Sequence, residues 1–246
     1  MSIIKNYEYF LSVLVIFLFS IFINNFYGNV GVFPLDSFLS FDAGYKFSNG
    51  ELPFRDIWSP FGFTLDLIQG FIFHFFGISW NNYVVHASVF NSLLALATFH
   101  ILNKFNIKII HALIFSILIS VVSYPVPATP FLDHHSVILS ILMLYSFILH
   151  LKTKKNFYLI FIPIFFSLAF LSKQTPSAYI LVCLSFVGLI YLIFNFSYKK
   201  IISLLIGIFI VVFFLSFFFF KNKIPFSAFW QQYILFPLTI ADTRTG

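Results

Sequence analysis

The stretch from Ile201 to Phe220 reads IISLLIGIFIVVFFLSFFFF and contains no charged residue. About twenty consecutive apolar residues are what a helix needs to cross roughly 30 Å of hydrocarbon. The whole chain has the same character, because 60% of its residues are hydrophobic and only 9% are charged, whereas about a quarter are charged in a soluble domain. Several such runs follow one another, which a single removable signal peptide does not explain. The chain is therefore predicted to be an integral membrane protein.

Hydropathy predicts about seven spans, and with them an all-α, polytopic transmembrane helical bundle that forms a single domain over residues 1–246. A long first extracytoplasmic loop, about 28–79, separates the first two spans and is expected to contain interfacial helices. The predicted spans are Glu8–Tyr27, Trp80–Asn103, Ile107–Ser123, His134–Leu151, Asn156–Leu171, Thr175–Phe196 and Ile201–Phe220.

One further apolar stretch, Phe61–Ile78, is predicted to stay on the outer side rather than to cross, and the reason is the distribution of charge. With this arrangement the lysines that fall on the cytoplasmic side are Lys5, Lys104, Lys108, Lys152, Lys154, Lys155, Lys199 and Lys200, as the positive-inside rule requires. The acidic residues that fall outside are Asp36, Asp42, Glu51, Asp56, Asp66, Asp133 and Asp242, which leaves only Glu8 within. Asp66 lies inside the stretch itself, and an ionised carboxylate is costly at the centre of a bilayer.

Composition also argues against several functional classes. The formal charge of +6 comes from lysines in short clusters between hydrophobic runs, so nucleic acid is not expected as a partner. The cytoplasmic connections are only a few residues long and leave no room for a P-loop or a nucleotide-binding domain. A disulfide is also not expected, because Cys183 is the one cysteine. The short cytoplasmic connections bear on a further class of protein. An ATP-driven pump is therefore not predicted.

The first outer loop contains the residues best suited to chemistry. Asp36, Asp42 and Asp56 lie there with Arg55, next to hydrophobic sequence. Partial burial at a membrane boundary raises the pKa of a carboxyl group toward working pH, which suits a general base. The alternative interpretation is that these are solvated loop charges with ordinary turn residues at Asn49-Gly50.

The order of residues in this loop resembles that of the C-type glycosyltransferases. More narrowly, it is similar to the dolichyl-phosphate-mannose protein mannosyltransferase-like and aminoarabinose transferase-like bacterial membrane enzymes. The matching residues are Asp36, Tyr45, Gly50, Pro53, Phe54, Arg55, Asp56, Gly62 and Phe76-Gly77. Two later stretches also look similar, namely residues 129–136 (TPFLDHHS) and 170–176 (FLSKQTP). The chain departs from many members of the group, because Asp36 is followed by Ser37 where they have a second acid.

The resemblance implies transfer of a sugar from a polyprenyl-phosphate donor to an extracytoplasmic glycan, lipid or protein acceptor. It assigns Asp36 as the catalytic base, with Asp42 as its rival six residues later. A departing lipid phosphate needs a nearby cation, for which Lys173 is the first choice and Arg55 the second. The substrate-binding residues that the resemblance implies are Tyr45, Arg55, Asp56, His134, His135, Lys173 and Gln174.

Asp133, His134 and His135 leave three interpretations open. A carboxylate and two imidazoles are good ligands for a divalent cation, but adjacent histidines on one helix point about 100° apart and rarely hold the same ion. One alternative is that these residues form hydrogen bonds to the sugar donor or to the acceptor substrate. The other is that Asp133 caps a helix. His86, within a span, is expected to be a neutral histidine satisfied by contact with a neighbouring helix.

Two other functions remain open at this stage. One is a transporter or flippase for lipid-linked saccharides, although no internal repeat of the kind found in such proteins is visible. The other is a non-catalytic membrane subunit that takes part in envelope assembly. On the leading hypothesis the chain lies in the bacterial inner membrane with a cytoplasmic N-terminus, and it is expected to be an N-terminal fragment of a longer enzyme.

Overall fold

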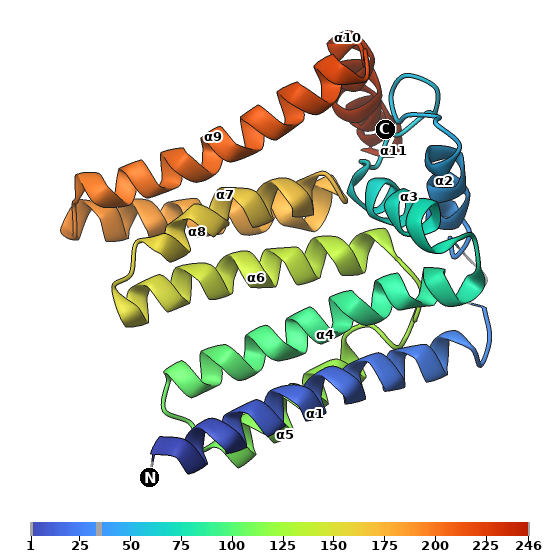
Figure 1. The fold of residues 1–246 in the computed structure, drawn as a ribbon. Helices are drawn as coiled ribbons and strands as arrows, with labels where there is room; N and C mark the ends of the chain where they lie inside the picture. The colour runs from blue at the N-terminus through green and yellow to red at the C-terminus, as the bar shows by residue number, and fades with distance from the viewer. Residues whose placement is uncertain (1, 33–35, 246) are drawn as a thin grey trace.

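The structure is a computed structural model that describes residues 2–32 and 36–245, with side chains described from Tyr7 to Ile240. Almost all of its regular structure is helical, and it builds one bundle with a cap of shorter helices at one end (Figure 1). The prediction of an all-α fold is therefore confirmed. Within the described ranges, β-type pairing consists of one isolated bridge between Pro53 and Ile57.

Five helices of the described chain are long and apolar enough to cross a membrane by themselves. They are α1 (Ser2–Gly28), α4 (Trp80–Lys104), α6 (Leu132–Thr153), α8 (Gln174–Phe194) and α9 (Tyr198–Lys221). Many of their large apolar side chains are exposed, such as Phe209 in α9 and Phe186 in α8. Exposed apolar surface of this extent requires lipid as its solvent. The chain is a multi-pass integral membrane protein.

Two of the seven predicted spans form shorter helices. α5 (Ile109–Val122) and α7 (Phe157–Phe170) have 14 residues each, which at 1.5 Å per residue is about 21 Å. Each lies alongside longer helices, α5 against α1 and α4, and α7 against α6 and α9. Each of the seven predicted spans therefore contains a helix, and five of these helices reach the length of a full crossing alone.

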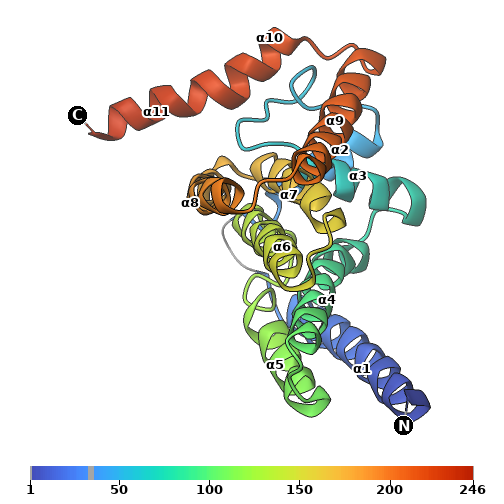
Figure 2. The same cartoon turned by 90° about the vertical axis from the view of Figure 1, so that its left-hand side faces the viewer.

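The first loop folds into α2 (Leu39–Ser48) and α3 (Thr64–Phe76), which pack against each other at one end of the bundle (Figure 1). At the same end lie α10 (Phe226–Phe229), the π-helix η1 (Trp230–Leu235) and α11 (Phe236–Thr245). In Figure 2, α10 and α11 extend sideways from the top of α9 rather than continuing along the bundle. α3 has 13 residues and is too short to cross a bilayer alone.

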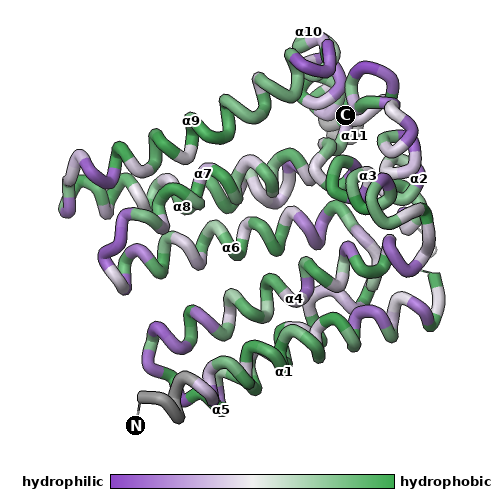
Figure 3. The backbone as a smooth tube through the Cα atoms, in the orientation of Figure 1, coloured by the Kyte–Doolittle hydropathy of each residue, from purple (hydrophilic) through white to green (hydrophobic). Residues whose placement is uncertain are grey.

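The connections between the long helices sort by charge. Those joining α4 to α5, α6 to α7 and α8 to α9 all lie at the end where α1 begins (Figure 1), and this end is called the lysine end here. Its lysines are Lys104, Lys108, Lys152, Lys154, Lys155, Lys199 and Lys200. The opposite end, called the acidic end, holds the first loop and the start of α6. Figure 3 shows hydrophilic residues concentrated at both ends and hydrophobic residues between them.

Buried amides hold the long helices together. The Asn91 side chain of α4 donates to the Ser20 carbonyl of α1 at 3.1 Å and to the Ser120 carbonyl of α5 at 2.9 Å. Asn24 of α1 donates to Ser88 of α4 at 3.0 Å. Polar side chains between membrane helices are expected to bond across the interface because no water is present there. These bonds fix the relative positions of α1, α4 and α5.

The first loop is attached to the connection between α7 and α8. Phe63 and Thr64 both donate their backbone N–H to the Leu171 carbonyl, at 2.8 and 3.1 Å. Gly62, just before them, has φ +115°, and a Cβ there would lie 2.1 Å from the Leu171 oxygen. Only glycine accommodates both this backbone conformation and this approach. The attachment places the loop over the residues that follow Leu171.

Candidate functional site

A cavity of about 100 Å³ opens at the acidic end. It is formed by the first loop, the segment that leads into α6, and the connection between α7 and α8. The residues that matter most for its chemistry are Asp36, Ser40, Phe61, Phe131, Asp133 and Lys173. This cavity, named the Asp36 cavity, brings together two of the residues predicted for the site from distant parts of the chain. Asp133 adds a second carboxylate.

Asp36 is held by the turn that leads into α2. Its φ is +64°, in the left-handed region that Asp and Asn tolerate better than most residues, and its carbonyl accepts the Leu39 N–H at 3.1 Å. The next residue, Ser37, is buried, and the Tyr83 hydroxyl of α4 donates to its carbonyl at 2.6 Å. The turn is thus fastened to α4, while the Asp36 side chain stays exposed in the cavity.

Lys173 supplies the positive charge of the cavity. Its ammonium donates to both oxygens of Asp133, at 2.7 and 2.8 Å. Its carbonyl accepts hydrogen bonds from Ser136 at 3.2 Å and from Ser177 at 2.9 Å, so the backbone is fixed from α6 and from α8. The Lys173 side chain is 28% exposed and the Asp133 side chain 45% exposed, so both remain reachable by a ligand.

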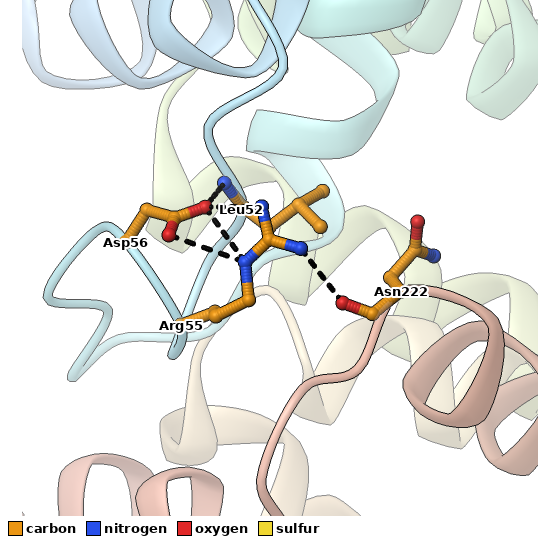
Figure 4. A network of polar contacts seen from close by, with 4 residues as sticks. All are labelled: Leu52, Arg55, Asp56 and Asn222. Carbon is orange, nitrogen blue, oxygen red and sulfur yellow. Dashed lines mark hydrogen bonds and ion pairs between the residues drawn. The ribbon is translucent and has the colours of Figure 1, made fainter.

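Arg55 and Asp56 lie elsewhere and brace the first loop (Figure 4). The Arg55 guanidinium donates to both oxygens of Asp56, at 2.7 to 3.1 Å, and to the Asn222 carbonyl at 2.8 Å. Asp56 also accepts the Leu52 N–H at 2.9 Å. The Arg55 bonds, followed by the Leu52 bond, hold the pKa of the Asp56 carboxyl below its usual value. The structure places neither residue on the lining of the Asp36 cavity.

Asp42, Tyr45 and Gln174 also lie off the lining. Asp42 pairs with Lys46 at 2.8 Å on the exposed face of α2, where it raises the pKa of that lysine. Tyr45 is exposed on the same helix. The Gln174 amide donates to the Pro60 and Tyr233 carbonyls, each at 3.0 Å, and so ties the first loop to η1. Of the two rival bases, only Asp36 faces the cavity.

The side chains of Asp133, His134 and His135 diverge. Asp133 turns to Lys173, His134 packs on the rings of Tyr124 and Phe131, and His135 is fully buried between α4 and Tyr124. In the described part of the chain, no three metal-ligating side chains of the His, Cys, Asp and Glu types converge. These three residues do not fit a shared divalent cation in this arrangement.

His135 belongs to a buried chain of hydrogen bonds whose direction can be deduced. The Gln69 oxygen at one end of the chain can only accept, so a neutral His86 has its hydrogen on Nδ1 and accepts at Nε2. At the other end, the Tyr124 hydroxyl accepts the Phe131 N–H at 2.9 Å and donates to His135 Nδ1. A neutral His135 then donates from Nε2 to His86 Nε2 at 3.0 Å. His86 in turn donates from Nδ1 to the Gln69 oxygen at 2.9 Å. The chain links α3, α4 and α6.

Sequence reasoning missed this chain. His86 was expected to be a neutral histidine bonded to a neighbouring helix, and the contact with neighbouring helices is confirmed by its bonds to His135 and Gln69. Its partners could not be named, because residues far apart in sequence become neighbours only when the helices pack. The sequence did contain one indication, because ionisable residues inside apolar spans often have a functional or structural partner.

Fold and site together define a class: an all-α, multi-pass membrane protein with a charged cavity at its acidic end. No protein-family model, no curated protein and no solved structure matches the chain.

Proposed function

We propose that this protein is a membrane glycosyltransferase that moves a sugar from a polyprenyl-phosphate donor to an extracytoplasmic glycan, lipid or protein acceptor. The observation that supports it best is the meeting of Asp36, Lys173 and Asp133 in one cavity at the acidic end. Lysines gather at the opposite end, and by the positive-inside rule they favour a cytoplasmic position for that end. With that orientation, the Asp36 cavity faces the extracytoplasmic side of a bacterial inner membrane.

Each charged group of the cavity has a role in this reaction. The acceptor oxygen attacks the anomeric carbon as the bond from that carbon to the phosphate oxygen breaks. Asp36 takes the proton of the acceptor hydroxyl, a step that typically contributes about 10²–10⁴-fold to the rate. The Lys173 ammonium donates to the departing lipid phosphate, and charge-assisted bonds of this kind are among the stronger ones. Asp133 positions the ammonium before the phosphate arrives.

The test is transfer of radiolabelled sugar from a panel of polyprenyl-phosphate donors by membranes that contain the protein. Asp36→Asn is expected to lower the rate by about 10²–10⁴-fold, as loss of a general base does. Asp42→Asn is the matched control, since Asp42 is an acid of the same loop that pairs with Lys46 outside the cavity. Lys173→Gln is expected to lower the rate and to weaken donor binding, whereas Lys46→Gln leaves both near the native level.

Undiminished transfer by Asp36→Asn would exclude this mechanism. Absence of transfer by the native protein with every donor, when the protein is shown to be folded, would favour the transporter or the non-catalytic subunit instead. Flipping of a fluorescent lipid-linked saccharide in vesicles then separates those two.

A further inference from the structure

A second and larger cavity lies between the helices near the lysine end. It has a volume of about 540 Å³, within the range of ligand pockets. Its walls come from α6, α7, α8 and α9 and are almost wholly apolar. This cavity is named the α8–α9 groove. It shares no lining residue with the Asp36 cavity.

The packing of α7 and α9 explains why the groove exists. α9 approaches α7 so closely at Gly207 that a Cβ there would lie 2.3 Å from the Ile160 carbonyl oxygen and 2.5 Å from Pro163. Ser203, one turn earlier, is buried, so the contact uses two small residues spaced as in close membrane-helix pairs. α8 packs instead on α6 and α7. A groove therefore lies between α8 and α9, and side chains of α7 form its floor.

Basic residues gather where the groove reaches the lysine end. Tyr191 lines the groove, and the Lys200 ammonium lies 4.5 Å from the centre of its ring. His150 bonds the Tyr191 hydroxyl at 3.1 Å with one nitrogen and the Lys155 carbonyl at 3.1 Å with the other. Lys155 and Lys200 are each one turn beyond a lining residue, Leu159 and Leu204 respectively. The Lys200 ammonium and the Lys155 backbone are therefore both in contact with the Tyr191–His150 pair at the mouth of the groove.

The charge at this mouth is not neutralised by the protein. Every ion pair in the described part of the chain lies at the acidic end. A ligand with an apolar tail and an anionic head is complementary to the groove and to its mouth. Basic pockets between membrane helices on the cytoplasmic side bind anionic phospholipid headgroups. The donor lipid of the proposed reaction fits less well, because its phosphate belongs at Lys173, on the lining of the other cavity.

We propose that the α8–α9 groove is a binding site for an anionic phospholipid of the cytoplasmic leaflet. An acyl chain lies between α8 and α9, and the phosphate meets Lys155 and Lys200. The proposal is independent of the glycosyltransferase activity, because it rests on a different cavity at the opposite end.

The experiment titrates the purified protein in detergent with phosphatidylglycerol or with phosphatidylcholine of the same acyl chains, and counts bound lipids by native mass spectrometry. Two lysines near the membrane surface predict a preference of about thirtyfold for phosphatidylglycerol. The double change Lys155→Gln, Lys200→Gln is expected to abolish that preference. Its matched control is Lys104→Gln, Lys108→Gln, at the same end but beside α4 and α5, which keeps the preference.

Gly188 gives a second, steric test. It lines the groove, and a Cβ added there meets no atom within 4 Å, so a large side chain can enter the empty space. Gly188→Phe is expected to abolish binding of the lipid, whereas Val187→Phe, on the exposed side of α8, leaves it unchanged. Equal binding of the two lipids by the native protein would overturn the proposal. So would an unaltered preference after loss of Lys155 and Lys200, or displacement of the phospholipid by polyprenyl phosphate from the same site.

Discussion

At the residue scale, the buried chain from Tyr124 to Gln69 makes a prediction about stability. His135→Phe leaves the hydrogen of the Tyr124 hydroxyl without an acceptor and His86 Nε2 without a donor, and each such buried group costs about 1–3 kcal/mol. The Tyr124 oxygen keeps the bond from the Phe131 N–H. His134→Phe is the control, because His134 already packs on aromatic rings and its buried Nδ1 has no hydrogen-bond partner. Thermal unfolding in detergent, followed by tryptophan fluorescence, should therefore show a clear loss for His135→Phe and little change for His134→Phe.

The same chain predicts that its members are energetically coupled. Once His135 is replaced, His86 has already lost one partner, so a second change at His86 should cost less than it does in the native protein. Losses that simply add in a double-mutant cycle would contradict the hydrogen bond at 3.0 Å between the two imidazoles.

How much of the site was predictable depends on the residue. Asp36 and Lys173 were selected from the sequence because a resemblance linked them, and both line the Asp36 cavity. The divergence of His134 and His135 was expected from helix geometry and is confirmed. The separation of Arg55 from the cavity was not predicted, because its partner Asn222 comes from the far end of the chain. Local sequence contains no signal for a contact of that kind.

At the element scale, the attachment of the first loop to Leu171 should be sensitive to a single methyl group. Gly62→Ala introduces strain at a positive φ of about 1–3 kcal/mol and also a Cβ that overlaps the Leu171 oxygen. Gly50→Ala and Gly77→Ala are matched controls, because both glycines have positive φ but no atom within 4 Å of the added Cβ. The melting temperature in detergent should fall further for Gly62→Ala than for either control. Equal losses in all three would mean that backbone strain alone, and not the contact with Leu171, is what the variant disturbs.

Helices were the easiest elements to predict, since hydropathy identifies a run that must satisfy its backbone hydrogen bonds internally in lipid. Each predicted span contains a helix, including the two short ones, α5 and α7. The cap at the acidic end was predicted only in outline. Gln232 of η1 accepts the Ser59 N–H at 3.0 Å and donates to the Phe54 carbonyl at 3.1 Å. These bonds join segments with no periodic pattern, so neither their register nor their contact follows from local sequence.

At the scale of the whole molecule, the two ends differ in chemistry in a way that one topology explains. The acidic end has the cap, the Asp36 cavity and all three ion pairs found in the described chain. The lysine end has short connections, and the lysines described there have no carboxylate partner. An orientation with the lysine end in the cytoplasm would account for this arrangement. The positive-inside rule favours lysines on that side, and the anionic lipids of the cytoplasmic leaflet attract them. α3 lies beside α2 at the acidic end, so α4 begins at that same end.

That argument yields a prediction in which the position of α3 decides the result. In a Cys183→Ser background, single cysteines at Glu51, Val126 and Lys108 report on the first loop, the connection before α6 and the connection between α4 and α5. All three positions are exposed. If α3 stays at the acidic end, a membrane-impermeant maleimide added to intact cells labels the cysteines at Glu51 and Val126, and labels the one at Lys108 only after permeabilisation. If α3 crosses the bilayer, every later segment changes side, so Lys108 is labelled in intact cells and Val126 is protected. That second pattern would separate Asp36 from Lys173 by the whole membrane, and would exclude both the topology and the function proposed for the Asp36 cavity.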